Sequence, residues 1–277
     1  SNPDYMINVN GTIFFTANDG TNGTELWKTD GTSAGTVMVK DINPGSGSSS
    51  PFTMFNFNGV LYFTANDGTN GYELWKSNGT TAGTVLVRNI NPGSASSLPR
   101  HFCISHNVLY FQATTATNGA ELWKTGGTSA TTVLVADINT GTANSYPSHL
   151  TDVNGVLFFA ADNNTNGNEL WKSSGTAATT SLVADINTTS SGAGDSNPSF
   201  LYAIGNTVYF RAADCTGTGT FSTCTGPELY KSNGTSAGTV KVRDFVSGAG
   251  AGGNPTPTTS LGSTLYFTVY SSPSLWK

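Results

Sequence analysis

The chain has 277 residues and a formal net charge of −5, and only 10% of its residues are charged, far below the quarter typical of a soluble domain. It has no basic cluster, and it has no apolar run as long as the roughly 18 residues that a membrane helix needs. We therefore expect no nucleic-acid partner and no membrane span.

One short stretch of sequence recurs along the whole chain. Glu25-Leu26-Trp27-Lys28 returns three times at a spacing of 48 residues, then as Glu228-Leu229-Tyr230-Lys231 after 59 residues and as Ser274-Leu275-Trp276-Lys277 after 46. Units of this length are typical of arrays in which each unit buries its apolar face only against its neighbours. We expect one domain, 1-277, with units at approximately 1-48, 49-96, 97-144, 145-195, 196-253 and 254-277, the last incomplete.

The second unit illustrates the pattern within each repeat. Its four short runs, at 52-56, 60-65, 72-76 and 84-90, are rich in β-branched and aromatic residues. Asn58-Gly59 and Asn70-Gly71 separate the first three runs, and Asn-Gly is a strong signal for a tight turn between antiparallel strands. The sixth unit ends at Lys277 without a fourth run.

Units of four antiparallel strands predict an all-β fold, a six-bladed β-propeller of four-stranded antiparallel blades whose last blade lacks its outer strand. A β-helix is the alternative, although its turns repeat at shorter spacing. A large aromatic at one place in the third strand of each unit is expected to pack adjacent blades, and a sugar-stacking platform is the alternative role. These residues are Trp27, Trp75, Trp123, Trp171, Tyr230 and Trp276.

The residues that follow the recurring stretch carry a resemblance to a known family. Asp30-Gly31-Thr32-Ser33-Ala34-Gly35-Thr36 and Val37-Met38-Val39-Lys40-Asp41-Ile42 complete a pattern that resembles the ELWK-type repeat, ELWxxDGTxxGT, of bacterial secreted and surface proteins with hyalin-like repeats. The resemblance covers essentially the whole chain. It implies a propeller located outside the cell or on its surface, and it supplies no active site to carry over.

The cysteines bear on the same question. Cys215 and Cys224 lie nine positions apart in the long insertion of the fifth unit. We expect a disulfide between them, which would restrain the unfolded loop and would persist outside the cytoplasm. Two reduced thiols are the alternative. Cys103 lies in a predicted strand, where we expect a small buried hydrophobe.

The recurring glutamates are the most conspicuous carboxylates. Catalysis needs two carboxylates in different environments at one bond, whereas the repeat places one in each unit. We therefore expect them to bond turn amides or to pair with a lysine, and we predict no catalytic residue. They are Glu25, Glu73, Glu121, Glu169 and Glu228.

Metal and nucleophile signals are weak. Asp19, Thr21 and Glu25 resemble an oxygen-rich calcium loop, but the third and fourth units replace the first carboxylate by Thr115 and Asn163. The three histidines have no metal-ligand spacing, and no Gly-x-Ser-x-Gly elbow occurs. We predict no cofactor and no metal, with calcium as a weak alternative. The histidines, expected to be solvated or to face a central channel, are His101, His106 and His149.

The sequence thus favours a non-catalytic extracellular repeat protein that serves as a structural or adhesive surface module. The alternatives are a lectin-like propeller that binds polysaccharide and, third, an enzyme acting on extracellular polymer. Expected partners are a second copy, a surface or matrix polysaccharide, or a protein. The missing last strand predicts either that the chain continues beyond Lys277 or that an open blade edge is left for pairing with another chain.

Overall fold

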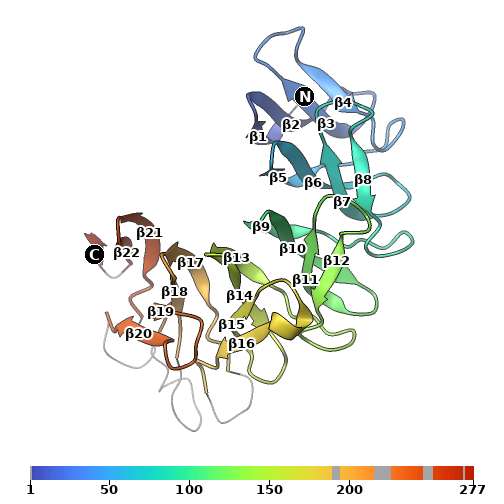
Figure 1. Cartoon of the computed structure of the whole chain (residues 1–277). Coiled ribbons are helices and arrows are strands. Elements are labelled where there is room, and N and C mark those ends of the chain that lie inside the picture. Colours follow the sequence, from blue (N-terminus) through green and yellow to red (C-terminus); the bar gives the residue numbers. More distant parts are fainter. Residues whose placement is uncertain (1, 189–193, 215–225, 246–251, 271) are drawn as a thin grey trace. The chain divides into compact units, whose positions relative to one another are not determined.

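The computed structural model describes residues 2–188, 194–214, 226–245, 252–270 and 272–277. Within these residues the chain has the all-β fold class that the sequence predicts, a six-bladed β-propeller, with the antiparallel sheets of its blades following one another along the chain (Figure 1). Its sheets are antiparallel, with strands in chain order, and the last has three strands where the others have four. The 3-10 turn η1 (Ala177–Thr179) is the one described helical segment, and no described helix is long and apolar enough to cross a membrane.

The described chain falls into two compact units, residues 1–119 with 123–133 and residues 120–122 with 134–277. Organisation as one domain stays a prediction. The first three blades have the following strands. They are β1 (Asp4–Val9), β2 (Thr12–Asn18), β3 (Thr24–Thr29) and β4 (Val37–Lys40) in blade 1, β5 (Phe52–Phe57), β6 (Val60–Asn66), β7 (Tyr72–Ser77) and β8 (Val85–Arg88) in blade 2, and β9 (Arg100–Ser105), β10 (Val108–Thr115), β11 (Gly119–Thr125) and β12 (Val133–Ala136) in blade 3.

The other three blades lie in the second unit. Their strands are β13 (Ser148–Val153), β14 (Val156–Asp162), β15 (Asn168–Ser173) and β16 (Ser181–Ala184) in blade 4, β17 (Ser199–Ile204), β18 (Thr207–Ala212), β19 (Glu228–Ser232) and β20 (Val240–Arg243) in blade 5, and β21 (Thr256–Leu261), β22 (Thr264–Val269) and β23 (Ser272–Trp276) in blade 6. Cys215 and Cys224, for which the sequence predicts a disulfide, lie outside the described residues.

The hairpins form where the sequence predicts them. Asn58 and Gly59 have φ values of 52° and 79°, and the Asn56 side chain accepts a hydrogen bond from the Gly59 amide at 2.9 Å. Positive φ is accessible to Asn and Gly at little cost, and the turn sets the register of β5 on β6. Because β6 is covered on both faces, Leu61, Tyr62 and Phe63 are all buried and the strand reads as a continuous apolar run.

The cores lie between neighbouring blades of each unit. Trp75 of blade 2 packs in a cluster that holds Val39 and Ile42 of blade 1. Tyr230 of blade 5 packs in a second hydrophobic cluster, which holds Val153 and Phe158 of blade 4. The blade-packing role of the whole aromatic set stays a prediction, because Trp27 and Trp276 are only half-buried.

One expectation for a buried residue needs correction. Cys103 is half-buried in β9 rather than buried, and its thiol lies 3.7 Å from the Ile104 carbonyl oxygen. β9 is an edge strand with β10 as its one hydrogen-bonded neighbour in the sheet, so a side chain near its middle can stay partly exposed.

Candidate functional site at the blade junctions

A buried glutamate joins each blade to the connection that leads to the next. The carboxylate of Glu73, in β7, accepts hydrogen bonds from the amides of Ile90 at 2.8 Å, Asn91 at 3.2 Å and Ser97 at 3.1 Å, and from the Ser97 hydroxyl at 2.5 Å. The side chain is completely buried. Burial raises the pKa of Glu73 to about 7, although these four hydrogen bonds act in the opposite direction.

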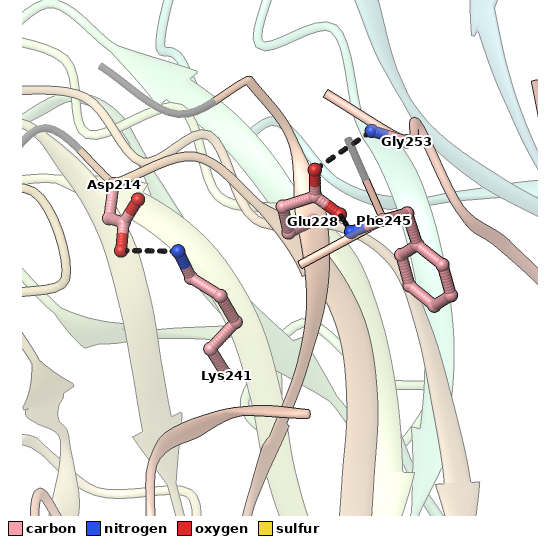
Figure 2. A network of polar contacts seen from close by, with 5 residues as sticks. All are labelled: Asp214, Glu228, Lys241, Phe245 and Gly253. Carbon is pink, nitrogen blue, oxygen red and sulfur yellow. Dashed lines mark hydrogen bonds and ion pairs between the residues drawn. The ribbon is translucent and has the colours of Figure 1, made fainter. Parts of the chain in front are cut away.

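The same arrangement recurs with Glu25, Glu121 and Glu169. In blade 5 a glycine, Gly253, stands where the other connections have serine, so Glu228 accepts the amides of Phe245 at 3.1 Å and Gly253 at 2.9 Å without a hydroxyl (Figure 2). The prediction that the glutamates bond backbone amides is confirmed. Three lysines of the repeated stretch act differently, because Lys28, Lys76 and Lys172 each donate to a glycine carbonyl of the next blade at 2.7, 2.9 and 2.7 Å.

The connection between blades is also held through its own backbone. The Ser97 carbonyl accepts the Thr114 amide of β10 at 2.8 Å, and the Leu98 amide donates to the Tyr72 carbonyl of β7 at 3.1 Å. Ser97 and Leu98 are therefore bonded to blade 2 and to blade 3 at once. We call this arrangement the junction frame, and it recurs at Ser49, Ser145, Ser196 and Gly253.

The junction frame holds non-glycine residues in the left-handed backbone region. Such residues cost about 1–3 kcal/mol each and persist where surrounding contacts enforce them. One set lies just before the proline of each connection, with φ between 44° and 49°: Ser50, Leu98, Tyr146, Asn197 and Asn254. A second set lies at the bulge in the inner strand, with φ between 50° and 58°: Tyr5, Thr53, His101, His149 and Phe200. The bulge backbone recurs in blades 1 to 5 with different side chains, whereas blade 6 has a proline, Pro257, at this position.

Pockets open beside these positions in both units. The pocket between blades 1 and 2 has a volume of about 310 Å³ and is lined by Asp4, Tyr5, Thr16, Ser50 and Phe52, among others. The pocket between blades 5 and 6 has a volume of about 840 Å³. It is lined by Arg211, Asn254, Thr256, Thr268, Val269 and Tyr270. The two are related by the repeat, because Thr16 and Arg211 occupy one register position and Ser50 and Asn254 another.

Among the described residues that line the larger pocket, Arg211 is the one that carries a charge. Its Nε donates to the Ser199 hydroxyl at 3.2 Å, and its guanidinium carbon lies 4.5 Å from the centre of the Phe200 ring. Burial lowers the pKa of Arg211, which nevertheless stays charged at neutral pH. The ring of His149 lies 6.2 Å from Phe200, and burial followed by the Arg211 charge lowers the pKa of this histidine.

A second pair of small cavities lies beside the lysines of the repeated stretch. One, of about 150 Å³, is lined by Lys28 and Gly79, and its counterpart in the other unit, of about 260 Å³, by Lys172 and Gly234. In both the lysine donates to the glycine carbonyl of the next blade at 2.7 Å. The cation is therefore engaged in joining the blades.

The loop that resembles a calcium site makes contacts typical of a turn. Asp19 accepts the amides of Thr21 and Asn22 at 2.8 Å each, which is the chemistry of a turn. The Glu25 carboxylate is occupied by the junction frame. Among the described residues no three acidic, histidine or cysteine side chains form a cluster that could hold a metal ion.

The left-handed positions and Arg211 do not stand out from the composition or the repeated stretch. A serine, one variable residue and a proline recur at 49–51, 97–99, 145–147 and 196–198, and this pattern could have marked the junctions. Of the predicted histidines, His101 and His149 occupy the bulge set, whereas His106 lies in the next turn with a φ of 47°.

No protein-family model matches the chain, and no curated protein matches it either. Among solved structures, the computationally designed Ika8 protein is 12% identical, with a TM-score of 0.52 over 100% of this chain and 71% of that one. The S511A mutant of puromycin hydrolase complexed with PGG is 11% identical, with a TM-score of 0.50 over 96% of this chain. This chain spans 42% of the length of that hydrolase. At these identities the similarities bear on the fold alone.

Proposed function

We propose that the chain is a non-catalytic extracellular adhesion module that binds polysaccharide through its blade junctions. One observation carries the proposal: the junction frame recurs at successive junctions, whereas the exposed or half-buried side chains that it holds in left-handed backbone differ. Strained backbone is retained where its geometry is used, and variable side chains on a rigid frame suit recognition.

The carboxylates support the non-catalytic part of the proposal. Perturbed pKa values often mark active sites, and burial raises the pKa of Glu73, Glu121 and Glu169 to about 7. These side chains are, however, completely buried and bonded to the connection, and none lines the four cavities described above. The extracellular location rests on the resemblance to bacterial ELWK-type surface repeats.

A glycan array probed with the whole chain tests the proposal. We expect binding to a subset of polysaccharides, competed by the free sugar and without release of soluble fragments. The combined variant Tyr5→Asn and Phe200→Asn should bind more weakly, because asparagine accepts the left-handed backbone but removes both rings. The variant Val240→Asn, on an exposed outer strand, is the matched control. Silence across a broad array, or cleavage of the bound polymer, would contradict the proposal.

A further inference from the structure

We infer that the pocket between blades 5 and 6 binds the carboxylate of an acidic sugar, such as a uronic acid residue of a polysaccharide. The inference rests on the proposed function and names the ligand class of one of its junctions. It depends on a cation that has no acidic partner among the described residues, on the rigid presentation of that cation, and on the neutral polar groups opposite it.

The cation is Arg211, and the described residues give it no acidic partner. The nearby acid Asp214 pairs with Lys241 at 2.9 Å, and neither residue is among the described residues that line the pocket (Figure 2). A half-buried guanidinium without a counter-charge favours binding of an anion. The positions equivalent to Arg211 in the first four blades are neutral; they are Thr16, Thr64, Gln112 and Ala160.

The guanidinium is held in place before any ligand arrives. Ser199 accepts a hydrogen bond from its Nε, and the Phe200 ring lies against the group at 4.5 Å. These contacts leave the terminal N–H groups for a ligand. The planar fork of arginine matches the two oxygens of a carboxylate, and a fork already restrained loses less entropy when it binds.

The rest of the wall suits the hydroxyls and the ring of a sugar. Asn254, Thr256 and Thr268 provide an amide and two hydroxyls, which can donate and accept. Tyr270 follows β22 with 88% of its surface exposed, so its ring can pack against the apolar face of a sugar. The volume of about 840 Å³ lies in the range of roughly 300–1,000 Å³ that is usual for small-ligand sites.

The corresponding pocket between blades 1 and 2 has the opposite character. It carries Asp4, has Thr16 at the arginine position and has a volume of about 310 Å³. A carboxylate ligand would be repelled there. The net charge of −5 also opposes long-range attraction of a polyanion, so affinity must come from short-range contacts with Arg211. We therefore expect the pocket between blades 1 and 2 not to bind an acidic sugar.

Isothermal titration calorimetry of the whole chain tests the inference with three probes: trigalacturonate, its methyl ester and neutral galactotriose. We expect trigalacturonate to bind at least tenfold more tightly than the ester. The Arg211→Gln variant should bind trigalacturonate at least tenfold more weakly than the wild type does. Its affinity for the methyl ester should change little. Arg211→Lys should recover only part of the loss, because lysine keeps the charge without the fork. Lys231→Gln removes the same charge from an exposed site outside the pocket and should bind like the wild type.

The outcomes separate the inference from the proposed function. Equal affinity for acid and ester, or an Arg211→Gln variant that keeps full affinity and its melting temperature, would overturn the inference. If galactotriose alone binds, the proposed function of sugar binding stands, and the inference that the ligand is an acidic sugar is wrong. If no probe binds and the glycan array is silent, both fail. Tyr270→Ser should weaken acid and ester alike, because the exposed ring contacts the sugar rather than the carboxylate.

Discussion

At the scale of single residues, the buried glutamate is the group on which the junctions depend. The Glu73 carboxylate accepts hydrogen bonds from two donors at each of its two oxygens. In Glu73→Gln the amide nitrogen must face at least one backbone N–H, and an unsatisfied buried donor costs about 1–3 kcal/mol. We expect the free energy of unfolding in urea to fall by about that much. Ser97→Ala, which removes one hydroxyl, should cost less, about 1 kcal/mol; equal stability of wild type and Glu73→Gln would contradict this role.

The same residues predict how stability depends on pH. Burial raises the pKa of Glu73, Glu121 and Glu169 to about 7, above the ordinary value of 4.5. Between pH 4.5 and 7 the folded state keeps protons that the unfolded state has released, so this contribution is full below pH 4.5 and is lost as pH rises through 7. The melting temperature should fall between pH 5 and pH 8. Glu73→Gln should flatten that slope, whereas a melting temperature that rises over the range would refute the assignment.

At the scale of elements, the turn between the second and third strands fits tightly against the junction. Gly71 has a φ of 69°, and a Cβ placed there would lie 2.8 Å from the carbonyl oxygens of Ser94 and Ala95. Gly93, with a φ of 92°, has no neighbour within 4 Å of its Cβ position. Gly93→Ala should therefore cost about 1–2 kcal/mol for left-handed backbone alone. Gly71→Ala should cost clearly more in thermal unfolding, and equal losses would show that the close approach does not matter.

The bulge in the inner strand stores strain that a substitution can release. Thr53 is β-branched and has a φ of 50°. Asparagine accepts this conformation more readily, so Thr53→Asn should raise the free energy of unfolding by about 1 kcal/mol, the low end of the cost of such strain. Thr53→Val keeps the branching and should give no gain. Destabilisation by Asn and not by Val, measured by urea unfolding, would contradict the account.

The elements themselves could be predicted well from sequence. Asn58-Gly59 and Asn70-Gly71 fix the turns through local chemistry, so the strands of blade 2 begin and end within a few residues of their expected positions. The close approach at Gly71 could not be predicted, because it depends on a connection 23 to 24 residues later in the chain. The sequence indicates that the turn at Gly71 needs a residue that accepts positive φ. It does not indicate that a Cβ there would also meet the later connection.

At the scale of the whole molecule, repetition explains both what was predictable and what was not. Comparison of the units exposes what all blades share, so the fold class and the amide-bonding role of the glutamates could be predicted and are confirmed. A feature that occurs in one blade only cannot be recognised by comparing the units. Arg211 is a single substitution at a position that is otherwise neutral, and only the register of β17 on β18 brings it beside Ser199.

The crystal structure of the chain soaked with trigalacturonate would test the central claim most directly, namely that the junction frame presents side chains for recognition. We expect the sugar between blades 5 and 6, its carboxylate on Arg211 and a ring against Tyr270, with the backbone of Asn254 unchanged. Sugar bound away from every junction, or none bound at saturating concentration, would contradict the account.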